Sequence, residues 1–587
     1  MKKLLIVFLI ATVTVAYAND SKLSPELRGY NSTQQVQVIV QYTPGTQVNC
    51  SGIIGLIFCA VDDILKLGGS ILAQVPLVNG VVALLDGPGI LNLSNQSNVV
   101  YISTDRKLTP ALSNAAPAVN AFYAWQSGYT GAGIGVALID SGVSSHPDLN
   151  GGFLGSSRVV WNQSFVSGNS SASDQYGHGT HIAGLIAGNG ASSTGSKYSR
   201  TFKGIAPQVN LVNLRVLDQN GQGTDSAVIS AISQAISLKS MFNIRVINLS
   251  LGRPVYETYK LDPLCKAVEA AWKSGIVVVV SAGNNGRYLA TEGYGTITAP
   301  GNDPYVITVG AMKPMGTPTR VDDQMASYSS KGPTAADAIV KPDVVAPGNL
   351  LVSLEAPGST LYNNYPTDRV PYKYYVNGGS TSPSSTYFSL SGTSMAAGVV
   401  SGAVADMLQK TPSLTPDQVN ARLMKTAWKS LPAYSSYTDP STGITYSDQD
   451  DVFTVGAGYV DVEASLNNTD RSYRTAMSPV AVFNSTGNVS MKDDPSAVWN
   501  TSSTWSNSAV WGSSQFLASA YASSTSGSLS GSNALWGGSA AWGSNALWGG
   551  SSTSGSNALW GGNALWGGSG MWSSNALWGG SAPGGEN

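Results

Sequence analysis

Between about residues 121 and 466, short runs of consecutive apolar residues alternate with segments of helical periodicity. The runs read IGVALID, VNLVNLRVL, IRVINLSL, GIVVVVSAG and PYVITVGA, and such runs are typical of strands buried on both faces of a parallel sheet. Two helical stripes lie between them, Val228, Ile229, Ile232 and Ile236 in one and Ala267, Val268, Ala271 and Trp272 in the other. The pattern predicts an α/β domain with a doubly wound parallel sheet, whose chemistry lies at the carboxyl ends of the strands.

The chain before this domain has the pattern of a smaller unit. In QVQVIVQY, valines fall on one face of a strand and glutamines on the other. Apolar runs follow at residues 80–85 and 99–102, with a helix expected around residues 62–67 and a short segment near Leu91. These elements predict a small open α/β sandwich, which ends in the exposed linker STDRKLTPALSNAAPA.

The C-terminal part has a third pattern, dominated by Gly, Ser, Ala, Asn and Trp. From Ser496 to the end, the only charged side chain is Glu586, and NALWGG occurs five times. Most of the tryptophans are six residues apart or a multiple of six, and an even spacing puts them all on one face of an extended chain. The tail could therefore stack as a small β array or form a flexible low-complexity stalk, and the sequence favours neither over the other.

Composition and the N-terminus indicate an exported protein. Charged residues are 11% of the 587 and the net charge is -2, so the chain lacks the basic surface of a nucleic-acid-binding protein. The first residues read MKKLLIVFLIATVTVAYAND, with lysines, an apolar run too short to span a bilayer, and Ala-Tyr-Ala before Asn19. We therefore expect a signal peptide at residues 1–18 and a secreted protein, extracellular or periplasmic.

The three cysteines allow at most one intrachain disulfide. Cys50 and Cys59 are close enough in sequence to pair in an oxidising compartment, which leaves Cys265. Cys265 lies in PLCKAVEAAWKSG, where we expect it to fill a helix face.

Three motifs carry the side chains that acyl transfer needs. Asp140 closes the apolar strand of VALIDSG, His178 opens a helix in GHGTHIAG, and Ser394 begins a helix in LSGTSMAAGVVSGAVADML. Each alone has an ordinary explanation, as a turn residue, a helix start or an N-cap. Together they supply a nucleophile, a base that takes its proton, and a carboxylate that orients the base.

The remaining histidines and a fourth motif complete the candidate site. His146 lies in a loop and His181, one helical turn after His178, is expected to pack inward. A zinc site is disfavoured, because no Asp, Glu or Cys occurs between Asp174 and Asp218 and no HExxH pattern is present. In VVVVSAGNNG, Asn284 follows a strand and could donate to an oxyanion together with the backbone N–H of Ser394.

These motifs, in the order Asp, His, Ser, resemble those of the subtilisin-like serine proteases, or subtilases. The resemblance covers roughly residues 121–466, including YSSKGP, KPDVVAPG and LTPDQVNARLMKTA. It implies a secreted serine endopeptidase that acts on proteins and peptides and needs no cofactor for catalysis. It also implies that the smaller N-terminal unit is a ferredoxin-like inhibitory propeptide, cut in the linker between about residues 105 and 121.

The family also implies a substrate cleft with two edge strands. Gly221, Gln222 and Gly223 match one edge, and Ser250, Leu251 and Gly252 match the other, so that a peptide could add between them. No acidic residue adjoins Asn284, so we expect broad specificity with a mild preference for apolar or aromatic side chains.

Two departures from the family pattern concern packing and calcium. Gly398 and Val399 replace the usual Pro and His in the helix interior, where we expect an effect on packing alone. Asp148 matches a family calcium ligand, yet the loop NGASSTGSKYSRTFK contains no acid, which puts a structural calcium ion in doubt.

The expected organisation is a signal peptide at residues 1–18, a propeptide at 19–115, a catalytic domain at 116–468 and a linker with repeat tail at 469–587. We expect a monomer whose propeptide acts as its intramolecular inhibitor. The tail could grip a glycan or cell surface through its aromatic side chains. The competing interpretation is a surface-binding protein in which this tail is the functional part.

Overall fold

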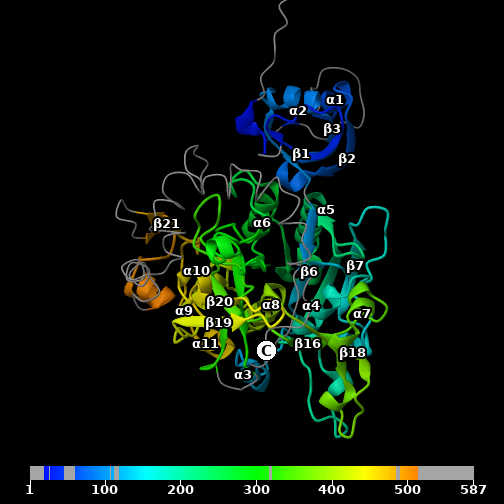
Figure 1. Ribbon diagram of the computed structural model, residues 1–587, viewed down its shortest axis with the longest axis vertical. Coiled ribbons are helices and arrows are strands. Elements are labelled where there is room, and N and C mark those ends of the chain that lie inside the picture. The colour runs from blue at the N-terminus through cyan, green and yellow to red at the C-terminus, as the bar shows by residue number, and fades with distance from the viewer. Residues whose placement is uncertain are drawn as a thin grey trace, which may run out of the picture. The chain divides into compact units, whose positions relative to one another are not determined.

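The computed structural model describes residues 19–24, 27–44, 46, 60–105, 107–110, 118–315, 320–483 and 489–512 (Figure 1). The chain forms two compact units, residues 1–105 and 106–587. The expected signal peptide, the Cys50–Cys59 pair and the NALWGG repeats lie outside the described residues. Within the described residues, no helix is both long and apolar enough to cross a bilayer.

The N-terminal unit is an antiparallel sheet with two helices. The strand order is β2-β3-β1-β4, and the elements follow the split β-α-β arrangement of ferredoxin-like folds. Its core is formed by side chains of the strands and of α2, among them Val38, Val40, Val81, Leu93 and Ile102. The elements are β1 Val36–Tyr42, α1 Ala60–Lys66, β2 Ser70–Val75, β3 Gly80–Leu85, α2 Gly87–Ser94 and β4 Val99–Thr104.

The second unit is built on a mostly parallel sheet whose strands coincide with the predicted apolar runs. The order is β14-β13-β12-β10-β6-β8-β7, with β15 also paired to β13, and only the β13–β14 pairing is antiparallel. The central strands β6 and β12 are buried along their whole length, which explains their lack of alternation. The bounds are β6 Gly135–Asp140, β7 Val159–Ser164, β8 Asn210–Arg215, β10 Ile244–Leu249, β12 Val277–Ser281, β13 Ile307–Lys313, β14 Gln324–Met325 and β15 Val344–Pro347.

Helices cover this sheet in two packed pairs. Helix α8 packs on β10, β12, β13 and β15 and against α4, whereas α5 and α6 pack on each other and on β6, β8, β10 and β12. The two stripes predicted from the sequence lie on the buried sides of α5 and α6, with Ile236 and Trp272 only half-buried. The longer helices are α4 His178–Ala187, α5 Asp225–Phe242, α6 Pro263–Lys273, α8 Thr393–Lys410 and α9 Pro416–Thr426. The doubly wound architecture expected from the sequence is confirmed.

Short elements frame the rest of this unit. Three strands, β5 Lys107–Pro110, β9 Gly223–Thr224 and β11 Leu251–Gly252, form one small sheet, and β16 Leu351–Leu354, β17 Arg369–Pro371 and β18 Pro383–Leu390 form another. Two hairpins follow, β19 Tyr434–Thr438 with β20 Thr445–Gln449, and β21 Val480–Phe483 with β22 Val489–Lys492. The short helices are α3 Ala121–Gln126, α7 Thr360–Asn364, α10 Val452–Val455, α11 Val462–Asn467 and α12 Asn507–Trp511.

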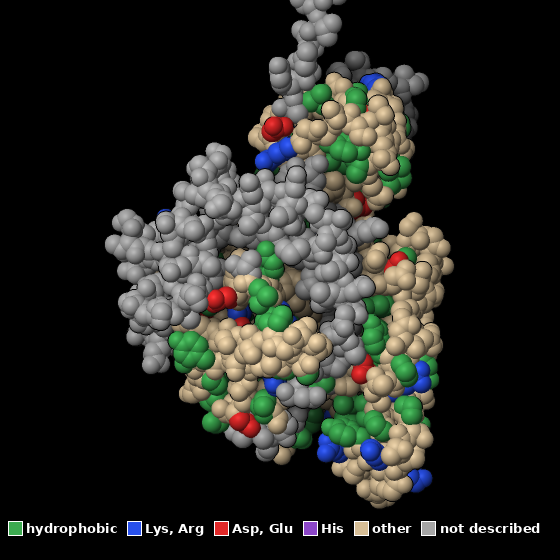
Figure 2. Space-filling model, in the orientation of Figure 1, with side chains coloured by type: hydrophobic (Ala, Val, Ile, Leu, Met, Phe, Trp, Pro, Cys, Tyr) green, Lys and Arg blue, Asp and Glu red, His purple; other side chains and the backbone are tan. Residues whose placement is uncertain are grey.

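The fold continues past the boundary expected at residue 468. The backbone N–H of Ala481 donates to the Ala338 carbonyl, and α12 packs on α9. Trp499, Trp505 and Trp511 belong to the same buried apolar cluster as the sheet. Residues 469–512 are therefore part of this unit, and the repeats begin after it. On the face drawn in Figure 2, charged side chains of the described residues are scattered rather than gathered in one patch.

Candidate active site

Three side chains predicted to act together lie at the ends of elements that meet at one edge of the sheet. Asp140 is the last residue of β6, His178 the first residue of α4, and Ser394 the second residue of α8. All three are buried. Both helices thus begin at the residues that carry the chemistry, as the sequence predicted.

Asp140 and His178 form a direct pair. Nδ1 of His178 lies 2.7 Å from Oδ1 of Asp140, and the backbone N–H of Ser141 donates to the same oxygen at 2.7 Å. Because the carboxylate accepts at Nδ1–H, the other ring nitrogen, Nε2, is the one left to accept a proton. This is the tautomer that a general base requires.

A second carboxylate, which the sequence did not single out, fixes the loop that presents His178. Oδ1 of Asp174 accepts from the Ser141 hydroxyl at 2.9 Å and the Gly177 N–H at 2.7 Å, and Oδ2 accepts from the Thr180 N–H at 2.8 Å. The Ser141 hydroxyl in turn accepts from the Gly179 N–H at 2.9 Å. Asp174 is buried, and this burial raises its pKa, while its hydrogen bonds oppose the rise. The strand end and the helix start are therefore tied together beside the Asp140–His178 pair.

Helices α4 and α8, which carry His178 and Ser394, pack against each other. A Cβ atom placed on Gly398 would lie 3.4 Å from Cγ2 of Ile182. Gly398 is one turn after Ser394 in α8, and Ile182 is one turn after His178 in α4. Gly398 and Val399 are both buried in this interior, where their departure from the family pattern was expected to affect packing.

Ser394 is also linked to one of the predicted cleft residues. Its hydroxyl donates to the Ser250 carbonyl oxygen at 3.1 Å, and the Ser250 hydroxyl donates to the Ser394 carbonyl oxygen at 2.7 Å. Ser250 follows β10 directly and precedes β11. The nucleophile candidate thus lies at the start of one cleft edge.

Asn284 is held in a defined orientation shortly after β12. Its Oδ1 accepts from both the backbone N–H and the hydroxyl of Thr393, each at 3.0 Å. The Thr393 hydroxyl accepts from the Gly283 N–H at 3.1 Å. With the carbonyl end of the amide occupied, the NH₂ end is the donor, and it belongs to a residue tied to the neighbour of Ser394.

The two predicted cleft edges pair with an extended segment of the same chain. Strand β5 runs antiparallel between β9 and β11, with Leu251 opposite Pro110, Gly252 opposite Thr109 and Gly223 opposite Leu108. Gly221 and Gln222 lie outside this ladder. They belong to a turn in which the Gln222 N–H donates to the Asp218 carboxylate at 2.9 Å. The edge on that side is therefore Gly223–Thr224, one step later than the sequence suggested.

The other two histidines are structural. His181 is fully buried, its Nε2 lies 3.0 Å from the Leu351 carbonyl oxygen, and burial together with the nearby His178 lowers its pKa well below the usual value. Nδ1 of His146 accepts from the Asp148 N–H at 3.1 Å, and burial lowers its pKa also. Both rings are thus held by backbone groups, and His178, which is paired with Asp140, is the candidate for proton transfer.

The residues around Asp148 do not fit a calcium ion. Both carboxylate oxygens have protein donors, the Tyr387 hydroxyl at 2.7 Å and the Ser192 N–H at 2.7 Å. The Arg158 guanidinium donates to the Asp148 carbonyl oxygen at 2.8 Å and to the Ala187 carbonyl oxygen at 2.5 Å. A cation already lies at this place, and no cluster of three acidic, histidine or cysteine side chains suited to a metal occurs in the described parts of the chain.

Comparisons with known proteins agree with this geometry. The model of the subtilase family, Peptidase S8, matches residues 131–459. Serine protease AprX of Bacillus subtilis is 37% identical over 338 residues, which are 56% of this chain and 70% of AprX. Subtilisin E of the same organism is 33% identical over 431 residues, 73% of this chain and 94% of subtilisin E.

A solved structure supports the same fold. Fervidolysin from Fervidobacterium pennivorans, described as a keratinolytic enzyme related to subtilisin, superposes with a TM-score of 0.54 at 22% identity. The match covers 75% of this chain and 62% of fervidolysin, so this chain spans less than two thirds of that protein. Family model, sequence relatives and fold agree: the chain belongs to the subtilase family and is a subtilisin-like serine protease.

Proposed function

We propose that the protein is a secreted serine endopeptidase that hydrolyses peptide bonds through an acyl-enzyme, with Ser394 as nucleophile, His178 as base and Asp140 as its orienting carboxylate. The observation that carries this proposal is the Asp140–His178 pair at 2.7 Å, together with the packing of α4 against α8, the helix whose second residue is Ser394. All these groups belong to one chain, so catalysis needs a single copy. Catalysis on this route needs no cofactor.

Each step uses a group whose position has been described. Nε2 of His178 takes the Ser394 proton as Oγ bonds to the peptide carbonyl carbon, and Asp140 stabilises the imidazolium. The negative oxygen accepts from Nδ2 of Asn284 and the backbone N–H of Ser394. His178 then gives the proton to the leaving amine as the C–N bond breaks, and water repeats the sequence to release the acid.

We further propose that the enzyme is made as a zymogen, in which the N-terminal unit is the propeptide and β5 occupies the cleft. Support comes from the pairing of β5 with both cleft edges. Leu251 lies opposite Pro110 in this antiparallel register, and the carbonyl oxygen of the preceding residue, Ser250, accepts from Ser394. We infer that self-processing cuts the Ala111–Leu112 bond.

The substrate range follows from how the cleft binds. Pairing along β9 and β11 uses backbone groups, which accept many sequences. The segment that follows β12 carries Gly283, Asn284 and Asn285, with no acid to attract a basic side chain. Broad specificity with a mild preference for apolar or aromatic side chains is therefore proposed for substrates, which are proteins and peptides.

Labelling of the processed enzyme with a serine-directed phosphonate, followed by peptide mapping, tests the central assignment. We expect the label on Ser394 alone, loss of casein hydrolysis in Ser394→Ala and His178→Ala, and a mature N-terminus at Leu112. Replacing Ala111 by Asp is the sharper test of processing, because a carboxylate beside the developing oxyanion should slow the cut. A Ser394→Ala chain that still hydrolyses casein and still sheds residues 19–111 would show that the assignment is wrong.

The competing function, surface attachment through the tail, is tested by the same chain. Retention of the catalytically dead Ser394→Ala protein on cell wall or insoluble polysaccharide would support attachment. If the same protein truncated after residue 512 were not retained, the binding part would lie in the repeats.

A further inference from the structure

A short docking unit occurs twice where residues 496–512 pack onto the second unit. It is Ala-Val-Trp followed by one residue with positive φ, at residues 497–500, which form a bridge and turn, and at residues 509–512, where Ala-Val-Trp ends helix α12. The closing residues are Asn500, with φ 60°, and Gly512, with φ 96°. Asn and Gly adopt positive φ more readily than other residues, which favours them at the closing position.

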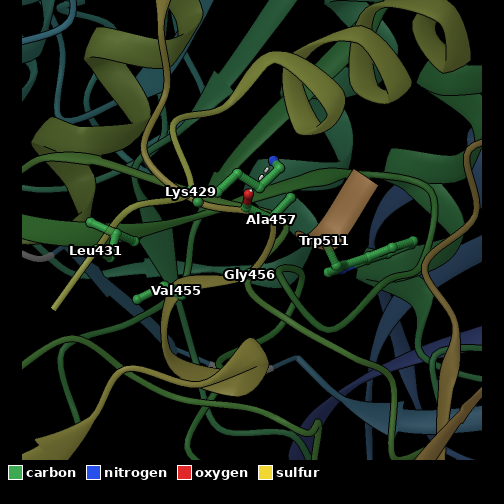
Figure 3. A pocket seen from close by; sticks show the side chains of 7 residues that line it. Lys429, Leu431, Val455, Gly456, Ala457 and Trp511 are labelled. Carbon is green, nitrogen blue, oxygen red and sulfur yellow. Dashed lines mark hydrogen bonds between the residues drawn. The ribbon is translucent and has the colours of Figure 1, made fainter. Parts of the chain in front are cut away.

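Both units are fixed by their apolar side chains. Val510 and Trp511 are 0% and 1% exposed, Trp499 is 3% exposed, and the two indole rings meet edge to face with centroids 4.7 Å apart. Figure 3 shows Trp511 on one side of a narrow hollow, with Ala457 beside it and Leu431 and Val455 on the far side. Helix α12 lies on α9 next to this hollow. We call α9 with residues 429–431 and 455–458 the docking face.

The repeats after residue 512 have the same sequence pattern. Each NALWGG contains Ala-Leu-Trp-Gly, with an aliphatic residue before Trp and Gly at the closing position. The spacing also agrees, because Trp499 and Trp511 are 12 residues apart, as are Trp536, Trp548 and Trp560 in sequence. The five repeats therefore match the docked unit in residue type and order. The 12-residue period joins Trp536, Trp548 and Trp560, and also Trp566 and Trp578, whereas Trp560 and Trp566 are six residues apart.

We propose that each NALWGG repeat is a further copy of this docking unit, and that a repeat of one chain binds the docking face of a second copy of this chain in place of residues 509–512. One chain has five such repeats in addition to the two units that already cover its own face. Exchange of near-identical elements between copies costs little, because the contacts that are lost are formed again.

Two further observations favour a second copy as the partner. Nε1 of Trp511 is buried without a hydrogen-bond partner among the described residues, so exchanging one Trp for another forfeits no polar contact of this ring. Between Ser496 and Gly585 the chain carries no charged side chain, and no repulsion between like charges opposes association of two tails.

Sedimentation velocity of the full chain tests the proposal, in the Ser394→Ala background to prevent self-cleavage. We expect a sedimentation coefficient that rises with protein concentration, and loss of this rise when W536A, W548A, W560A, W566A and W578A are combined. The matched control is W542A with W572A, because these tryptophans lie outside the Ala-Leu-Trp-Gly pattern; it should associate like the parent. A parent that stays a single copy throughout, or a control that loses association equally, would overturn the proposal.

Photo-crosslinking identifies the face that is bound. A benzophenone amino acid replaces Trp536 in a full chain with one affinity tag, which is mixed with a full chain carrying another tag. We expect crosslinks between the two tagged copies at residues 416–431 or 455–458. Crosslinks only within one copy, or only to other surfaces, would overturn the proposal, and so would retention of a single-copy species on polysaccharide through the repeats.

Discussion

Asn284→Ala is the substitution whose effect the geometry defines best. The side chain makes its described hydrogen bonds through Oδ1 with Thr393, which leaves Nδ2 as one of two donors to the oxyanion, beside the Ser394 N–H. In subtilisin, removal of one such donor lowers kcat by about 10²–10³, or about 2.7–4 kcal/mol of transition-state stabilisation. Since this chain belongs to that family and holds the amide by two bonds, we expect a loss in this range with KM changed much less.

Two further variants separate donation from positioning. Asn284→Asp keeps an acceptor for Thr393 but puts a carboxylate where the oxyanion forms, so its loss of kcat should be at least as large as that of Asn284→Ala. Thr393→Val removes one of the two bonds that orient the amide and should lower kcat by about fivefold to tenfold, corresponding to about 1 kcal/mol for one hydrogen bond. The neighbouring Asn285→Ala is the matched control, and its kcat should stay within about twofold.

The assay is hydrolysis of a peptide anilide, normalised to active sites by phosphonate titration. Processing of the Ala111–Leu112 bond gives an independent value, because the substrate is part of the same chain and the rate does not depend on KM. If Asn284→Ala retained the kcat of Asn285→Ala in both assays, the oxyanion role of Asn284 would be refuted.

Three other predictions concern groups away from the reaction. Glu355 is buried beside Arg369, and burial raises the pKa of its carboxyl to about 8. Between about pH 4.5 and 8 the unfolded chain therefore binds fewer protons than the folded chain. The free energy of unfolding should fall as pH rises through this range, by up to about 1.4 kcal/mol per pH unit. Urea unfolding of Ser394→Ala with and without Glu355→Gln should give a difference that changes with pH; a constant difference would contradict this. Chelator or added calcium should leave the melting temperature unchanged, since Tyr387, Ser192 and Arg158 already satisfy Asp148, and a calcium-dependent rise would show that a site was missed. Cys265 is buried with a raised pKa and should react with a thiol reagent only after unfolding, as peptide mapping would show.

The sequence predicted the sheet and the candidate site residues because both follow from local rules. Unbroken apolar runs required strands buried on both faces, and β6, β10, β12 and β13 lie at those runs. Asp140, His178 and Ser394 were found because each lies at an element end, within a motif of small residues. Asn284 followed for the same reason, at the end of the most apolar strand.

The residues that hold these side chains in place could not be predicted in the same way, because each forms hydrogen bonds with a residue that is distant in sequence. In sequence, Asp174 is an ordinary loop aspartate. Its role follows only from the fold, in which the hydroxyl of Ser141, 33 residues away, donates to it. In sequence, Thr393 is only the first residue of a helix. Its role follows from the fold, in which Asn284, 109 residues away, accepts from its hydroxyl. The cleft edge lies at Gly223–Thr224 because the preceding residues form a turn, in which the Gln222 N–H donates to the Asp218 carboxylate. Apart from the glycines, nothing in the sequence indicates this hydrogen bond.

The same distinction explains why the boundary at residue 468 was set too early. Loss of charge after Ser496 marks a change in composition, but composition cannot tell a stalk from a segment whose tryptophans have a surface to cover. That surface is made by residues far away in sequence, such as Leu431 and Val455, which line the same hollow as Trp511. A Trp-Gly segment is therefore part of a fold only where a docking face exists to cover its tryptophan. The repeats after residue 512 have the sequence of a docking unit, but residues 497–500 and 509–512 already occupy the docking face of their own chain. This is the physical reason to look for their partner on a second copy.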